Sequence, residues 1–97
     1  MKVVVTPEAA DDAKKAAVWY RRHDPRTVAG FRRRFNELVR LLADFPELGT
    51  LISGTPYRRV SLDRYPYSLI CYPTGTSLLI VAVLHDRQSI ERWLEDT

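Results

Sequence analysis

The chain has 97 residues and a formal net charge of +3, with 45% hydrophobic and 28% charged residues. These values fit one folded domain over residues 1–97, leave little room for a second, and exclude a disordered chain. The single cysteine, Cys71, excludes an intrachain disulfide and a Cys-based metal site. We expect no metal and no cofactor, and, because no apolar run is long enough for a signal peptide or a membrane span, a cytoplasmic protein.

The N-terminal segment predicts a strand followed by a helix. Residues 3–5 are three valines, which favour a short strand. Thr6 is a helix-capping residue, and Pro7 suits the first helical position, so the helix begins there and runs to about His23. Small side chains recur at helical spacing and allow another helix to approach closely. They form a face with one tyrosine: Ala9, Ala13, Ala16, Ala17 and Tyr20.

A second helix follows after a short connection. Asp24 before Pro25 repeats the pattern of a cap and a first-turn proline, and Pro46 and Gly49 predict the end of the helix. The short connection predicts an antiparallel helical hairpin. The buried stripe is expected to contain Phe31, Phe35, Leu38, Leu42 and Phe45.

Basic residues are concentrated on the two helices. Residues 14–40 contain nine basic and only two acidic residues, a balance that favours an acidic partner or nucleic acid. A solvated helix face explains the same pattern equally well. The positions opposite or beside the apolar stripe are Arg32, Arg33, Arg34 and Arg40, which we expect to face outward and to bind a protein partner.

The C-terminal half predicts three antiparallel strands and a short helix. After a loop at residues 49–56, strands are expected at residues 57–62, 65–72 and 78–84, with the turn of a hairpin at residues 73–76. The last strand is apolar throughout and ends in His85, Asp86 and Arg87. Ser89 caps a final helix that contains Trp93. The fold class is therefore α+β: a short N-terminal strand, an antiparallel helical hairpin packed on a small, mainly antiparallel sheet, and a short C-terminal helix.

Several segments in this order resemble the small toxins of the RelE/ParE superfamily from bacterial type II toxin-antitoxin modules, and the ParE-like branch most closely. The segments are Thr6-Pro7-Glu8-Ala9, Phe45-Pro46-Glu47-Leu48-Gly49, Arg58-Arg59-Val60, Tyr65-Pro66-Tyr67-Ser68-Leu69-Ile70-Cys71-Tyr72 and Ala82-Val83-Leu84-His85-Asp86-Arg87, followed by Trp93. The resemblance implies a toxin that a cognate antitoxin neutralises, with DNA contacted only through the antitoxin complex.

The ParE-like branch implies inhibition of DNA gyrase by protein binding. On this interpretation the target-binding residues are His85, Asp86, Arg87, Trp93, Arg58 and Arg59, and the antitoxin-binding residues are the four arginines of the second helix. A structural role is open for the same residues: Asp86 can pair with Arg87 or cap a backbone amide, and a charged strand edge discourages aggregation.

The RelE-like branch implies a ribosome-dependent messenger RNA endoribonuclease instead. Its catalytic candidates here are Arg59, His85 and Arg87, where His85 could transfer a proton. Against this alternative, family cations are replaced by Ser61 and Ser68, and the place of a proton-donating tyrosine is taken by Trp93, whose N–H does not titrate near neutral pH. A third alternative is a non-toxic nucleic-acid-binding or regulatory relative.

Overall fold

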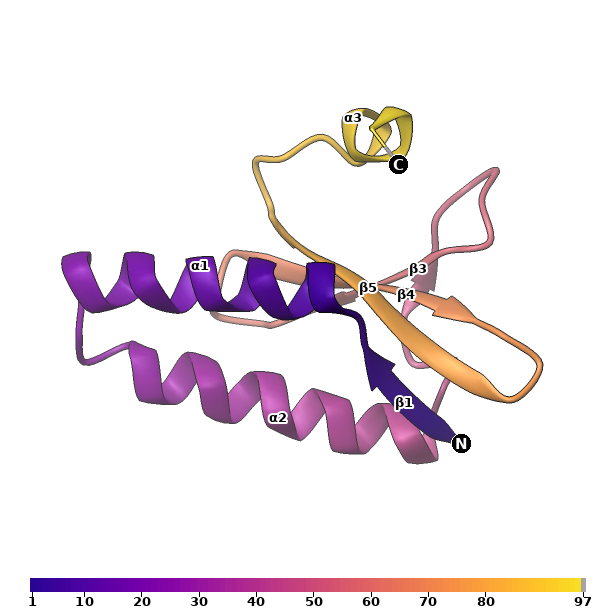
Figure 1. Ribbon diagram of the computed structural model, residues 1–97, viewed down its shortest axis with the longest axis horizontal. Coiled ribbons are helices and arrows are strands. Elements are labelled where there is room, and N and C mark those ends of the chain that lie inside the picture. Colours follow the sequence, from indigo (N-terminus) through magenta and orange to yellow (C-terminus); the bar gives the residue numbers. More distant parts are fainter. Residues whose placement is uncertain (97) are drawn as a thin grey trace.

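The computed structural model describes residues 1–96, and its helices and strands confirm the α+β class (Figure 1). In chain order the elements are β1 (Lys2–Val5), α1 (Pro7–His23), α2 (Val28–Asp44), β2 (Thr50–Leu51), β3 (Arg58–Ser61), β4 (Tyr67–Pro73), β5 (Ser77–His85) and α3 (Ile90–Glu95). The two long helices lie side by side in opposite directions, whereas α3 lies apart from them (Figure 1).

The strands form one sheet in the order β1-β5-β4-β3-β2. β1 pairs with β5 in parallel, from Lys2 opposite Ser77 to Val5 opposite Ile80, and the other neighbours are antiparallel. The prediction of a loop over residues 49–56 is wrong in part, because Thr50 and Leu51 form the edge strand β2, which pairs with β3. Two exposed residues carry no alternating pattern, so the sequence gives no sign of this strand.

Helix α1 forms as predicted. The Thr6 side chain accepts a hydrogen bond from the Ala9 N–H at 3.2 Å, and Pro7 occupies the first helical position. The small face packs inward against the sheet and α2, with Ala9, Ala16, Ala17 and Tyr20 all buried. Small side chains let the backbone of α1 approach its neighbours closely.

The start of α2 differs from the prediction. Asp24 caps the end of α1 rather than the start of α2: its own N–H donates to the carbonyl of Tyr20, and its carboxylate accepts from the Thr27 hydroxyl at 2.5 Å. Pro25 consequently lies in the turn, and α2 begins at Val28. The N-cap of α2 is instead Thr27, whose side chain makes no capping hydrogen bond.

The end of α2 also differs, because Phe45 is not part of the buried stripe. Phe31, Leu38 and Leu42 are buried as expected, but Phe45 is 58% exposed. The residue before a proline avoids the helical conformation, and Phe45 precedes Pro46. Its backbone accordingly leaves the helix, with φ −130° and ψ 73°, and the side chain rotates away from the stripe.

The sheet has a different apolar cluster on each face. On one face the helical hairpin covers the larger cluster, which includes Leu69, Cys71, Ile80 and Val83. On the other face Ile70, Ala82 and Leu84 pack with residues of α3, which covers a smaller area. None of the helices in the part of the chain described is both long enough and apolar enough to span a membrane.

Candidate functional site

Strand alternation divides the predicted site residues between the two faces of the sheet. Successive residues of a strand point to opposite faces, and cross-strand partners share a face. Arg59 lies opposite Ile70, which belongs to the α3 side, whereas Arg58 lies opposite Cys71 of the hairpin side. His85 lies opposite Tyr67, also on the hairpin side. Arg59 therefore lies on the opposite face from both Arg58 and His85.

A polar cluster of Arg59, Ser68 and Asp86 lies on the α3 side. Arg59 Nη2 is 3.2 Å from Asp86 Oδ1, and its Nε donates to Ser68 Oγ at 3.0 Å. The Ser68 hydroxyl in turn donates to Asp86 Oδ1 at 3.3 Å. Strand β3 supplies the arginine, β4 the serine, and the turn that follows β5 the carboxylate. Each member binds the other two, so the guanidinium is held in place and its charge is offset by the carboxylate.

Arg87 and Trp93 line a shallow hollow of 390 Å³ together with Leu84, Ser89 and Arg92. The Ser89 hydroxyl caps α3 by accepting from the Arg92 N–H, which confirms the predicted capping residue. The indole of Trp93 meets the Tyr57 ring edge-on at 5.2 Å, and so fixes α3 against the sheet. Gln88 and Asp96 also line the hollow, so it combines two arginines and one carboxylate with the apolar side chains of Leu84 and Trp93.

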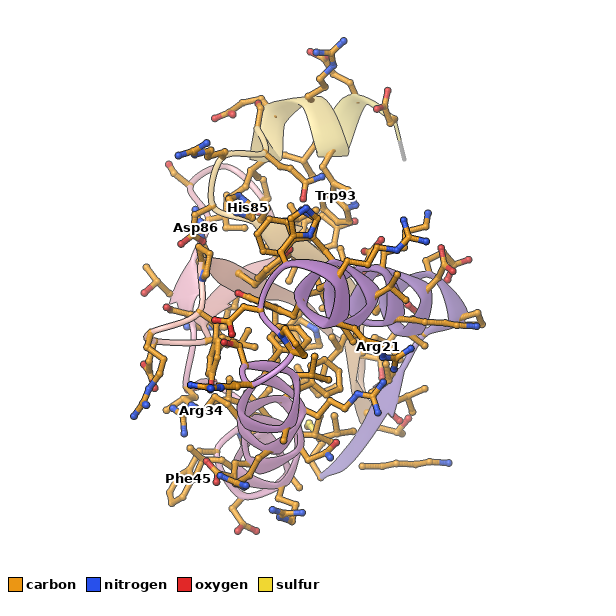
Figure 2. The ribbon with its side chains drawn as sticks, turned by 90° about the vertical axis from the view of Figure 1, so that its left-hand side faces the viewer. Arg21, Arg34, Phe45, His85, Asp86 and Trp93 are labelled. Atoms are coloured by element: carbon orange, nitrogen blue, oxygen red, sulfur yellow. The ribbon has the colours of Figure 1, made fainter. Side chains whose placement is uncertain are left out.

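His85 faces a different hollow, at the end of the hairpin. Its ring meets that of Tyr67 edge-on at 5.0 Å, and its Nδ1 accepts from the Arg87 backbone N–H at 3.1 Å. The hollow measures 510 Å³ and is lined by Trp19, Tyr20, Pro66, Tyr67 and His85. Figure 2 shows His85 and Asp86 following one another between α1 and α3. The adjacent residues His85 and Asp86 thus have different neighbours: His85 lies by the aromatic rings of the hairpin side, and Asp86 by Arg59 and Ser68 on the α3 side.

Arg58 has a structural partner on the hairpin side. Its Nη1 donates to the Gly49 carbonyl at 2.8 Å, which ties β3 to the segment that leads into β2. A methyl group at Gly49 would lie 2.8 Å from the Arg59 carbonyl oxygen. Arg58 therefore supports a tightly packed connection, and its guanidinium is partly engaged.

The four arginines of α2 point outward to different degrees. Arg32, Arg33 and Arg40 are exposed, as expected. Arg34 is half-buried and pairs with Asp63 at 2.6 Å and Glu37 at 3.3 Å. The contact with Asp63 ties α2 to the turn between β3 and β4, and the contact with Glu37 lies within α2, so Arg34 is anchored while the other three are available to a partner.

Within residues 1–96, no group of three or more His, Cys, Asp or Glu side chains is arranged to hold a metal ion. Burial raises the pKa of the Cys71 thiol to about 12, so it packs as a small hydrophobe, as expected. Sequence reasoning missed Ser68 as a bridge between Arg59 and Asp86. From the sequence, Ser68 stands out only because it replaces a cation of the family that the chain resembles. A serine on a strand carries no signal that would predict this contact.

The sequence matches a protein-family model, and the fold resembles that of solved structures. The family model described as "ParE toxin of type II toxin-antitoxin system, parDE" matches residues 3–90. A chain of the chromosomal ParDE toxin-antitoxin system from P. aeruginosa has the same fold, with a TM-score of 0.67 and 17% identity over 88% of this chain and 95% of that one. The YoeB/ParE toxin from Agrobacterium tumefaciens gives a TM-score of 0.60 and 20% identity, over 88% and 98%. No curated protein matches this chain significantly in sequence.

Proposed function

Because this chain belongs to the ParE toxin family of type II toxin-antitoxin systems, we propose that it inhibits DNA gyrase by binding it in the cytoplasm, and that a cognate antitoxin neutralises it. The target-binding surface of this proposal is the α3 side of the sheet, where Arg59, Asp86, Arg87 and Trp93 lie. Inhibition by binding needs a shaped surface and no nucleophile.

The ion pair between Arg59 and Asp86 is the observation that carries the choice of binding over RNA cleavage. Stabilising a phosphate in a transition state requires cations that are free to meet the developing charge. Here the Arg59 guanidinium is held by a carboxylate 3.2 Å away and by the Ser68 hydroxyl. An RNA phosphate at this position would also meet the negative charge of Asp86, which disfavours its approach.

The position of His85 supports the same choice. A general acid or base has to be within hydrogen-bond reach of the reacting group, near the cations that stabilise it. His85 lies on the hairpin side and Arg59 on the α3 side, with the sheet between them. Trp93, which follows on α3, supplies no titratable proton. The different faces taken by Arg59 and His85 therefore favour a binding surface over a ribonuclease site built from Arg59, His85 and Arg87.

The exposed arginines of α2 support an acidic antitoxin segment as the neutralising partner. Arg32, Arg33 and Arg40 are exposed on a helix whose opposite face is buried. Complementary charge on a partner steers association and fixes its register. Arg34 contributes less than the sequence alone suggests, because Asp63 and Glu37 already bind it.

Two assays with the purified protein test the proposal. We expect inhibition of gyrase supercoiling or trapping of cleaved DNA, and no cleavage of messenger RNA on programmed ribosomes. Arg87→Glu should abolish the effect on gyrase, whereas Lys15→Glu, on the exposed face of α1, should leave it unchanged. Codon-positioned cleavage by the wild type, reduced about 10²-fold or more in Arg59→Ala, would instead establish the ribonuclease.

A further inference from the structure

The hollow at the end of the helical hairpin has almost entirely aromatic walls. Trp19 meets Tyr20 edge-on at 5.4 Å, Tyr20 meets Tyr67 at 6.1 Å, and Tyr67 meets His85 at 5.0 Å. With Pro66 these rings line an open hollow of 510 Å³, within the range of roughly 300–1,000 Å³ of small-ligand pockets. The rings form one continuous network from α1 to the end of β5.

Trp19 is a large, half-exposed aromatic residue, and the packing of the core does not explain it. Its side chain is 51% exposed and belongs to neither apolar cluster of the sheet. One face of its indole carries the imidazole of His23, stacked at 4.3 Å with an interplanar angle of 12°. His23 is itself held in place, because its Nδ1 donates to the Trp19 carbonyl at 2.9 Å. A planar, nitrogen-containing ring thus already stacks in parallel on this indole.

Charge restricts the ligand class further. No carboxylate lines the hollow. Arg22 follows Trp19 by three residues and so shares its face of α1, and within residues 1–96 no acidic side chain forms an ion pair with Arg22. Aromatic faces by themselves attract cations, but the positive charge of Arg22 disfavours a cationic ligand and favours one that carries a negative charge near its ring. The lack of acidic and amide side chains in its walls disfavours sugars, whose hydroxyl groups need hydrogen-bonding partners.

The backbone around the hollow disfavours an extended peptide. The His85 N–H donates to the Gln88 side chain at 2.6 Å, and the Asp86 N–H donates to the Pro66 carbonyl at 2.8 Å. A peptide that adds to a sheet edge relies on free backbone groups of this kind. By contrast, a nucleic-acid base that stacks on an aromatic side chain needs no free backbone group, because every base has a π-face.

We infer that this hollow binds an unpaired base of single-stranded nucleic acid, stacked against Trp19, with Arg22 placed to meet the adjacent phosphate. This site lies on the hairpin side, on the opposite face of the sheet from the Arg59 cluster, and it does not depend on whether gyrase is the target. Aromatic stacking combined with cations along the backbone is the usual basis of sequence-tolerant single-strand binding.

Fluorescence anisotropy with a labelled short oligothymidine tests the inference. We expect the wild type to bind this single strand more tightly than the duplex of the same length, and its tryptophan fluorescence to be quenched. Trp19→Ala should weaken binding about fivefold or more, and Trp19→Phe should restore part of the loss. Phe45→Ala is the matched control, since Phe45 is an equally exposed aromatic residue away from the hollow, and it should bind like the wild type.

A second pair of variants tests the cation. Figure 2 shows Arg21 on the side of α1 away from His85, so Arg21→Ala should leave the salt dependence unchanged. Arg22→Ala should reduce the slope of log K against log salt by roughly 0.7. Circular dichroism confirms that each variant is folded. The inference is overturned if Trp19→Ala binds the oligonucleotide as tightly as Phe45→Ala does. It is equally overturned if an acidic poly(Glu,Tyr) copolymer, and not the oligonucleotide, binds in a Trp19-dependent way.

Discussion

Replacing Asp12 by alanine should destabilise the protein, because this side chain accepts a hydrogen bond from a part of β5 with which β1 does not pair. β1 pairs with β5 only as far as Ile80, and beyond that point β5 has no partner strand on this side. The Val83 N–H would be left without an acceptor, but α1 crosses here and the Asp12 carboxylate accepts from it at 3.0 Å. One helical side chain thus substitutes for a missing strand.

The magnitude follows from the burial of Val83, which is only 3% exposed. A buried N–H left without a partner costs about 1–3 kcal/mol. In a domain of this size that corresponds to a decrease in Tm of about 4–8 °C for each kcal/mol. Asp11→Ala is the matched control: Asp11 forms an exposed pair with Lys15 at 3.0 Å, and such pairs contribute roughly 0.2–1 kcal/mol.

The hydrogen bond of Asp12 raises the stability of the protein, whereas its buried charge lowers it at neutral pH. A second variant separates the two effects. Burial raises the pKa of Asp12 above its ordinary value of 3.8, although the Val83 N–H partly opposes the increase. A carboxyl with a raised folded-state pKa contributes stability that is complete below pH 3.8 and is lost as pH rises through the folded-state pKa. Asp12→Asn keeps an oxygen acceptor without a charge. It should therefore equal or exceed the wild type in stability at pH 7.

Urea unfolding followed by circular dichroism, at pH 7 and at acidic pH, measures both effects. The expected order at pH 7 is Asp12→Asn at or above the wild type, Asp11→Ala slightly below it, and Asp12→Ala lowest. The reasoning is refuted if Asp12→Ala is no more destabilising than Asp11→Ala.

Three further predictions concern other parts of the chain. Gly49→Ala should destabilise by about 1–3 kcal/mol in thermal unfolding, because its methyl group would lie 2.8 Å from the Arg59 carbonyl oxygen; Gly75→Ala, with open space around it, should change stability little, and equal effects would contradict this account. The Cys71 thiol, with its pKa raised by burial to about 12, should resist alkylation at pH 8 until urea unfolds the protein, and rapid labelling of the folded protein would be the opposite result. Reversing Arg33 and Arg40 together to glutamate should slow antitoxin association in stopped-flow measurements more than it weakens equilibrium affinity, and an unchanged rate constant would exclude this face of α2.

Local signals in the sequence predicted most of the elements. The cap at Thr6, the alanine face of α1 and the capping residue Ser89 were recognisable because each depends on neighbouring residues only. The errors arose where two local signals competed. Asp24 resembles an N-cap but binds Thr27 instead, and Phe45 continues the helical spacing but precedes a proline.

The candidate site was harder to predict because it depends on which face each side chain takes. Arg58 and Arg59 are adjacent in a strand, so their separation was available from alternation alone. The contact of Arg59 with Asp86 was not, since it requires the register between β3, β4 and β5. The place of Trp19 beside Tyr67 and His85 likewise follows only from the structure.

The pairing of β5 with β1 determines when the protein can fold during its synthesis on the ribosome. The first strand of the chain pairs with the last one, and α1 rests its small face against that same strand. Synthesis proceeds from the N-terminus, and contacts so distant in sequence form late because a long loop must close first. A nascent chain that ends before Ser77 can pack α1 on α2, but it lacks the strand with which β1 pairs and against which α1 rests. The sheet, the Arg59 cluster and the aromatic hollow are therefore completed only after β5 and Asp86 have been synthesised.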